Sequence, residues 1–159
     1  MKINKNKHIS LDKFISKALY DKKIGYYMHK NPFGEKGDFI TSPNISILFS
    51  EMLAIWCIAL WENLGCPKKI NIIELGGGNG EMMFRMIKVF ERFDKFLKAS
   101  KFFILEKSNF LKNIQKKKIT PFKVSWINSF DNLKSGPNIF LANEFFDALP
   151  VKQFIKKKK

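Results

Sequence analysis

Residues 72–81 read IIELGGGNGE, and this short stretch limits the choice of fold more than any other part of the chain. An apolar run ends in an acid, Glu74, and four glycines follow within five positions. Residues 81–93 then carry apolar side chains at helical spacing. A glycine turn between a strand and a helix lets a ligand approach the main chain closely. The stretch therefore predicts a strand, a ligand-binding loop and a helix, in that order.

Strands and helices continue to alternate after this loop. Apolar runs predict the strands, and amphipathic runs between them predict the helices. The expected strands are 69–75, 101–106, 122–127 and 138–145, and the expected helices are 81–93 and 108–118. This alternation indicates right-handed crossovers, and the apolar strands indicate burial on both faces. We therefore expect an α/β, Rossmann-like fold, with a mostly parallel sheet and helices on both faces.

The end of the chain, VKQFIKKKK, resembles the beginning of a fifth strand. A doubly wound sheet normally has more than four strands. We therefore expect that the C-terminal strands of the fold are missing, and that the Rossmann-like domain over 67–159 is incomplete.

Residues 1–66 are expected to form a helical and lid segment in front of that domain. Apolar residues at helical spacing predict a helix over 10–20. The glycine- and proline-rich stretch 25–43 predicts a loop, and its four aromatic residues favour a lid because they can bury apolar area. A second helix is expected over 42–64, with Ser42 as its N-cap and Pro43 as its first helical residue.

The glycine loop suits some ligands better than others. A P-loop needs a Gly-Lys-Ser/Thr sequence, which the chain lacks. A dinucleotide loop needs a third glycine at position 81, where Glu81 would instead face the diphosphate at a helix terminus. The spacing here is acid-x-Gly-x-Gly-x-Gly, formed by Glu74, Gly76, Gly78 and Gly80. This pattern suits a cationic ligand without phosphate. S-adenosylmethionine fits, because Glu74 can meet its amino group.

A second acid, Glu106, ends the expected strand 101–106. A carboxylate at that strand tip can accept hydrogen bonds from both ribose hydroxyls of a nucleoside. The alternative is a tight turn and an ordinary surface acid. The loop and the acid together favour cofactor binding over that alternative.

The net charge of +15 raises the question of an anionic partner. Arg85 and Arg92 are the only arginines among 29 basic residues, and the lysines are scattered along the chain. Nucleic-acid readers favour arginine, so we expect no specific nucleic-acid site; a basic binding module would show affinity that falls steeply with salt. His8 and His29 are isolated, which predicts no metal site. The longest apolar run, 52–61, is too short to span a bilayer.

Three stretches carry a family resemblance. They are NPFGEKGDFITSP at 31–43, IIELGGGNGEMM at 72–83 and NIFLANEFFDALPVKQF at 138–154. In this order they resemble the MidA-type family, which includes the mitochondrial arginine methyltransferases of respiratory complex I assembly. The resemblance implies a class I methyltransferase fold, S-adenosylmethionine as cofactor, and a chain that normally continues well past the third stretch.

The resemblance also implies roles for particular residues. The glycine loop would hold the cofactor and Glu106 its ribose. The GDFITSP stretch would close over the cofactor from the N-terminal side. Within that stretch, Gly37 permits a turn, while Asp38 and Thr41 offer polar contacts to the ligand.

An arginine acceptor would need carboxylates to orient its guanidinium, and three polar residues lie at the C-terminal end of the expected fourth strand. Open parallel sheets place their ligands at this end of the strands. We hypothesise that Glu144 and Asp147 contact the acceptor and that Asn143 orients it. The equal alternative is that Asn143 and Asp147 cap a following helix, while Phe145, Phe146 and Leu149 pack in the core.

Two functions follow from these expectations. The first is a protein-arginine methyltransferase that acts on a complex I subunit or a bacterial counterpart. The second is a non-catalytic assembly factor that binds a partner protein and keeps a vestigial cofactor site. We expect a bacterial cytoplasmic protein, with the mitochondrial matrix as the alternative, because the cationic N-terminus lacks arginine. The sequence does not indicate an oligomeric state.

Overall fold

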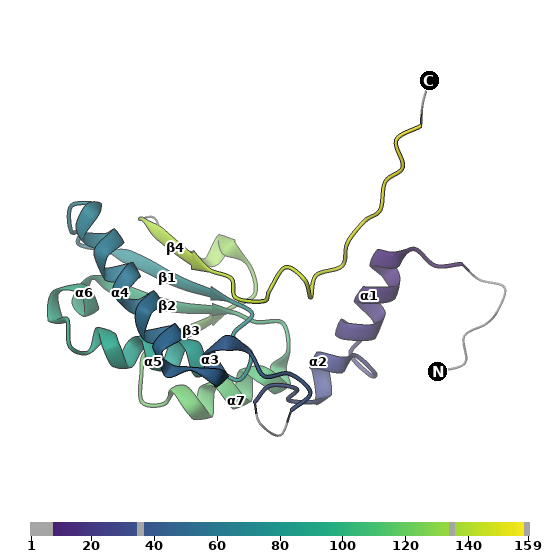
Figure 1. Ribbon diagram of the computed structural model, residues 1–159, viewed down its shortest axis with the longest axis horizontal. Coiled ribbons are helices and arrows are strands. Elements are labelled where there is room, and N and C mark those ends of the chain that lie inside the picture. The colour runs from purple at the N-terminus through teal and green to yellow at the C-terminus, as the bar shows by residue number, and fades with distance from the viewer. Residues whose placement is uncertain (1–7, 35–36, 134–135, 158–159) are drawn as a thin grey trace.

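A parallel sheet of four strands forms the centre of the computed structural model, which describes residues 8–34, 37–133 and 136–157. The strands are β1 Ile70–Leu75, β2 Ser100–Leu105, β3 Val124–Ile127 and β4 Asn138–Leu141. Their order is β3-β2-β1-β4, and every pairing is parallel (Figure 1). The expected α/β fold with a parallel sheet is therefore confirmed. The strands β2 and β3 lie on one side of β1, and the chain then returns to place β4 on its other side. A topological switch point therefore lies between β1 and β4, and open parallel sheets bind ligands at such points.

One face of the sheet carries the main core. The helices α4 Ile47–Asn63, α5 Glu81–Phe90, α6 Asp94–Ala99 and α7 Asn109–Ile119 lie on this side. Alternate strand residues such as Ile72, Phe102 and Ile139 point into it and pack against Met86 and Phe90 of α5. These side chains are almost fully buried, so the hydrophobic effect fixes the helices on this face.

The opposite face differs from the expectation of helices on both sides. Its smaller cluster contains Ile73, Leu75, Phe103 and Ile127. In the part of the chain that the structure describes, only the 3₁₀ helix η1 (Phe130–Asn132) and the residues after β4 lie against it. The strands are less continuously apolar than they first appear: Lys101, Ser125 and Asn138 also point to this face and remain exposed. A partly polar face needs less cover.

Several element boundaries differ from the expected ones. The helix expected over 42–64 is two helices, α3 Ser42–Ile45 and α4, because Ser46 between them has extended backbone at φ −137 and ψ 123. Thr41, not Ser42, occupies the N-cap position of α3. A short helix, α2 Tyr26–His29, lies inside the expected loop. The expected helix over 81–93 ends at Phe90, and the separate helix α6 follows it.

Two expectations at the C-terminal end are also corrected. The fourth strand ends at Leu141 and does not reach residue 145. Residues 151–157 form no strand and are exposed, so the expected start of a fifth strand is not present among them. These residues contain three lysines, and the segment leaves the sheet edge as an extended chain (Figure 1).

The N-terminal helices lie beside the carboxyl edge of the sheet. The helix α1 Leu11–Tyr20 forms where the apolar spacing predicted one, but none of its residues is buried. The helix α2 joins it to the sheet domain (Figure 1). The Tyr20 hydroxyl donates a hydrogen bond of 2.8 Å to the Ala148 oxygen, so α1 also contacts the segment after β4. The boundary between 1–66 and 67–159 stays a prediction. The helix α4 precedes this boundary, yet four of its side chains are buried in the main core with residues of the second range.

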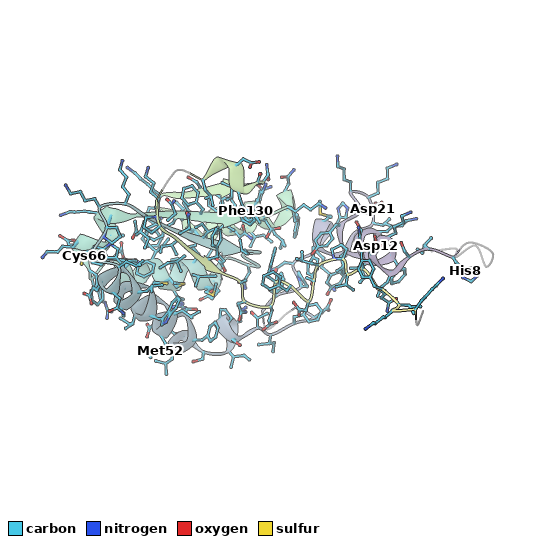
Figure 2. All side chains as sticks on the ribbon, turned by 90° about the horizontal axis from the view of Figure 1, so that it is seen from above. His8, Asp12, Asp21, Met52, Cys66 and Phe130 are labelled. Carbon is cyan, nitrogen blue, oxygen red and sulfur yellow. The ribbon has the colours of Figure 1, made fainter. Side chains whose placement is uncertain are left out.

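The outer side of α4 is unusually apolar. Leu48, Met52 and Trp56 are each more than half exposed. Figure 2 shows Met52 on the side of α4 that points away from the sheet. A helix that is apolar all round normally has neighbours on both sides. None of the helices in the described ranges is both long and apolar enough to cross a membrane.

Candidate functional site

A cavity of about 740 Å³ opens at the carboxyl edge of the sheet. Its walls come from the loop after β1, the residues after β2 and β4, and the N-terminal segments around α2 and α3. Volumes of this size are typical of small-molecule and cofactor sites. The carboxyl ends of parallel strands meet at one edge, which explains why residues far apart in sequence gather here.

The four glycines of the loop have two different neighbourhoods. Gly76 and Gly78 line the cavity and adopt positive φ angles of 69 and 51. A Cβ on Gly76 would lie 2.7 Å from the Phe145 ring, and one on Gly78 would lie 3.6 Å from the Phe33 ring. Side chains are therefore absent where the main chain faces the cavity and its two aromatic rings.

At the other two glycines, Gly77 and Gly80, an added Cβ would point into the interior of the protein, although Gly77 also lines the cavity. A Cβ on Gly77 would lie 2.9 Å from the Ile104 side chain, and one on Gly80 would lie 3.2 Å from the Gln115 main chain. Gly80 is not among the residues that line the cavity. The absence of side chains at these two glycines lets the loop pack closely on β2 and α7. Close approach of a ligand therefore accounts for only half of the glycine run.

Glu74 is a buried acid in the cavity wall. It is 3% exposed, and within the described part of the chain its Oε2 has no hydrogen-bond partner. Burial, reinforced by the charge of Glu106, raises the pKa of Glu74 to about 8. Buried polar atoms normally have partners, so an orphaned acceptor beside a cavity suits a donor on a bound ligand.

Glu106 lies directly after β2 and also lines the cavity. Its Oε1 accepts a hydrogen bond of 2.9 Å from the Ser108 backbone, and its Oε2 accepts one of 3.0 Å from the Gln115 amide. Burial raises the pKa of Glu106, although these donors oppose the shift. Each carboxylate oxygen has two acceptor positions, so both oxygens can still accept from a ligand.

The expected lid is an aromatic wall of the cavity. The rings of Tyr27 and Phe33 are stacked, with centroids 6.0 Å apart, and Phe39 and Thr41 line the same side. The amide of Asn79 in the glycine loop donates to Asn44 of α3 over 2.8 Å. This hydrogen bond connects the N-terminal segment to the glycine loop at the wall of the cavity.

Gly37 and Asp38, which were expected to contact the cofactor, are not among the residues that line the cavity. A Cβ on Gly37 would lie 2.2 Å from the Pro32 oxygen, so the turn itself requires glycine there. Asp38 is exposed and accepts hydrogen bonds from the Tyr26 hydroxyl and, over 2.5 Å, from Lys30. In this structure both residues therefore lie outside the cavity wall.

Asn143, Glu144 and Asp147 follow β4 and line the cavity together. Glu144 has a positive φ of 47, which costs about 1–2 kcal/mol for a residue with a side chain. Such strained positions cluster at functional sites. No helix begins in the described residues after β4, so the alternative in which Asn143 and Asp147 cap a helix has no helix to cap.

Sequence reasoning missed Gln115. Its side chain is fully buried and hydrogen-bonded to both Gly78 and Glu106. The signal was available, because Leu111, Gln115 and Ile119 recur at intervals of four on the buried side of α7. A polar residue in the centre of an apolar stripe indicates a buried hydrogen-bond network. Among the described residues, no group of three or more His, Cys, Asp and Glu side chains is arranged to hold a metal ion.

A parallel sheet with a glycine loop after β1 and an acid after β2 defines a Rossmann-like nucleoside-binding domain. A family model of S-adenosyl-L-methionine-dependent methyltransferases matches residues 52–159, and the chain belongs to this family. The orphaned acceptor of Glu74, the acid Glu106 and the bare main chain of Gly76 and Gly78 fit the family's cofactor.

Curated relatives support the assignment over the N-terminal segment as well. The chain is 32% identical to "Protein arginine methyltransferase NDUFAF7, mitochondrial" of Xenopus tropicalis, across 99% of this chain and 42% of the relative. The human protein of that name is also 32% identical, across 98% of this chain and 41% of its own length. The chain thus spans about two fifths of the relatives it matches.

Solved structures support the fold. A Burkholderia thailandensis methyltransferase-like protein bound to S-adenosyl-homocysteine superposes with a TM-score of 0.73 at 24% identity. The superposition covers 89% of this chain and 38% of that one. A native structure from the same organism gives a TM-score of 0.70 at 23% identity, over 91% of this chain and 36% of that one. The Rossmann-like methyltransferase fold is confirmed.

Proposed function

We propose that this chain is an S-adenosylmethionine-dependent methyltransferase domain that modifies a protein arginine. One observation carries the proposal: a single cavity collects the glycine loop, two buried acids and three polar residues from the ends of three neighbouring strands. The relatives' name, protein arginine methyltransferase, supports the acceptor class.

In this proposal the cofactor supplies a methyl group on a sulfonium when it is bound. Glu74 Oε2 would accept a hydrogen bond from its amino group, and Glu106 would accept hydrogen bonds from its ribose hydroxyls. The main chain at Gly76 and Gly78 would hold the rest of the cofactor, together with Thr41. Phe33 and Phe145 exclude water from this part of the cavity.

The acceptor is placed at the open end of the cavity. A guanidinium keeps its proton in solution, because its pKa lies above about 12. Glu144 and Asp147 are exposed acids on the cavity rim, so they can hold it through charge-assisted hydrogen bonds, while Asn143 orients it. Transfer would break the sulfur–methyl bond of the sulfonium, leaving a neutral thioether, as the carbon–nitrogen bond forms. The methylated nitrogen must then lose a proton, which one of the two carboxylates would accept.

The partner protein and the compartment belong to the proposal as well. The resemblance supports a complex I subunit, or a bacterial counterpart, as the acceptor protein. The relatives are named mitochondrial, which favours the mitochondrial matrix over a bacterial cytoplasm. Mass spectrometry of a deletion strain, searching for a lost arginine methyl mark, identifies the acceptor.

Two measurements on the purified chain test the proposed activity. Calorimetry with S-adenosylmethionine should give saturable binding. Glu144→Gln should keep that binding and lose most methyl transfer to arginine, since the amide can neither balance the guanidinium charge nor accept its proton. Gln153→Glu, at an exposed position away from the cavity, is the control. Unchanged turnover in Glu144→Gln contradicts its role.

The exposed apolar side of α4 favours a second candidate function. Leu48, Met52, Ile55 and Trp56 form a face that suits a protein partner. A non-catalytic assembly factor with a vestigial cofactor site would use this face and would not bind S-adenosylmethionine. The calorimetric titration therefore separates the two functions before any acceptor is known.

A further inference from the structure

Gln115 is the most completely hydrogen-bonded side chain near the cavity that the proposed chemistry does not use. It projects from α7 and is fully buried. Its Nε2 donates to the Gly78 oxygen over 2.9 Å and to Glu106 Oε2 over 3.0 Å. Its Oε1 accepts from Trp126 Nε1 over 2.8 Å. One amide thus connects the glycine loop, the acid after β2, and β3.

The chemistry of the partners fixes the orientation of this amide. The indole of Trp126 can only donate, so it must face Oε1 of Gln115. The Gly78 oxygen and the Glu106 carboxylate can only accept here, so both must face the NH₂ group. A flipped amide would place acceptor against acceptor at two contacts and donor against donor at the third. Only one arrangement satisfies the network.

The amide in turn holds Glu106. One carboxylate oxygen receives Gln115, and the other receives the Ser108 backbone N–H over 2.9 Å. Donors on both oxygens prevent the carboxylate from rotating. The remaining acceptor positions of Glu106, a cavity-lining residue, are therefore held in a fixed direction. A buried and fully satisfied network of this kind orders its members more strongly than one bond would.

The same side chain fixes the glycine loop. A Cβ on Gly77 would lie 3.2 Å from Gln115 Nε2, so the loop rests directly on the amide. The contact to the Gly78 oxygen adds a hydrogen bond to this packing. Loop and acid therefore share one support, and their relative position depends on it.

We propose that Gln115 is a positioning residue that aims Glu106 at the ribose hydroxyls of the nucleoside cofactor, with Trp126 holding the amide in its working orientation. The inference rests on the proposed function, because it assumes that the cavity takes an adenosyl ligand. It adds a determinant of ribose recognition that does not touch the ligand itself.

The test uses two ligands that differ only at the ribose. Calorimetry compares S-adenosylhomocysteine with its 2′,3′-dideoxyribose counterpart in the wild type, Gln115→Met and Trp126→Phe. Methionine fills a similar volume without the amide. A hydrogen bond to a charged group contributes about 1.5–3 kcal/mol, so the wild type should prefer the hydroxylated ligand by roughly 10-fold or more.

Gln115→Met should reduce that preference to about 3-fold or less, and it should weaken the dideoxy ligand by a smaller factor than the hydroxylated one, because the glycine loop loses a support as well. Trp126→Phe should give an intermediate preference, because the amide can then flip. Gln153→Met, the same exchange at an exposed position, should behave as the wild type. Thermal unfolding without ligand checks that each variant is folded.

Equal weakening of both ligands in Gln115→Met would show a merely structural role and overturn the inference, as would an unchanged preference. If Gln115→Met does not fold, Trp126→Phe decides the matter, since it keeps Gln115 and most of the ring volume. Failure of the wild type to bind either ligand rejects the proposed function and this inference with it. Binding by the wild type with no change of preference in the variants rejects the inference alone.

Discussion

The hydroxyl of Ser108 donates a hydrogen bond of 2.7 Å to the main-chain oxygen of Tyr27. Ser108 Oγ also accepts a hydrogen bond of 3.2 Å from the backbone N–H of Leu111 and so caps the N-terminus of α7. One hydroxyl of a buried residue therefore caps the start of a helix of the sheet domain and also binds the N-terminal segment at Tyr27. The position of the N-terminal segment and the stability of α7 therefore depend on the same hydroxyl.

Ser108→Ala tests this coupling. Loss of the cap should lower the free energy of unfolding by about 1–2 kcal/mol. Loss of the bond to Tyr27 should also loosen the lid and weaken binding of S-adenosylhomocysteine several-fold. Urea denaturation and calorimetry measure the two effects. Ser108→Thr keeps the hydroxyl and should retain most of both; a stability loss in Ser108→Ala without any loss of affinity would show that the cap acts alone.

Gly76→Ala tests the close approach of the main chain to the cavity. Alanine at φ 69 costs about 1–2 kcal/mol of backbone strain, and its Cβ would displace the Phe145 ring from 2.7 Å. We expect a lower unfolding temperature and a loss of S-adenosylhomocysteine binding of at least about 10-fold. Thermal unfolding and calorimetry provide the measurements.

Gly65→Ala is the matched control for that variant. Gly65 has a similar φ of 79, and a Cβ there would meet nothing within 4 Å. It should therefore show the backbone strain alone and keep the affinity of the wild type. If the two alanine variants bind the ligand equally well, the close approach at Gly76 has no role in binding.

Much of the fold could be predicted because the hydrophobic period changes along the chain. The strands and α7 were expected close to their observed places, since each has a distinct apolar pattern. The glycine run located the cavity because few other arrangements require bare main chain between a strand and a helix. The break at Ser46 was not predictable, since both flanking sequences favour a helix and only the backbone of one residue interrupts them.

The rest of the site depends on contacts between distant segments. In the sequence, Gln115 is an ordinary polar residue of a lysine-rich helix. Its role becomes visible only in the folded chain, where it is hydrogen-bonded to the glycine loop and to β3. Asp38 looked like a ligand contact because it lies in the distinctive GDFITSP stretch, yet Lys30 and Tyr26 hold it at the surface. The residue types at the strand ends were therefore predictable, whereas which of them face the cavity depends on tertiary packing.

The two cysteines should differ sharply in reactivity. Cys57 is buried in the main core, and burial raises the pKa of its thiol to about 12, whereas Cys66 is exposed. The thiolate is the reactive form. A disulfide exchange reagent at pH 8 should therefore label one thiol rapidly in the native chain and the second only on unfolding. Cys66→Ser should remove the rapid phase; a rapid phase that remains would mean that Cys57 is accessible.

The buried acid Glu74 should make stability depend on pH. Its pKa is raised to about 8 in the folded chain, and an unperturbed glutamate titrates near 4.3. Between these values the native state holds a proton that the unfolded state has released, so the stabilisation present below about pH 4 is lost as the pH rises to about 8. We expect the free energy of unfolding to fall by on the order of 4 kcal/mol between pH 5 and pH 9.

Glu74→Gln isolates this contribution, because the amide is neutral at every pH and has nearly the same shape. Urea unfolding across the pH range should give a sloping difference between the two proteins, with the variant gaining relative stability as the pH rises. Bound S-adenosylmethionine should reverse part of the slope in the wild type, since its ammonium favours the ionised carboxylate. Parallel pH curves for the wild type and Glu74→Gln would mean that Glu74 titrates alike in the folded and unfolded chains, so burial would not raise its pKa.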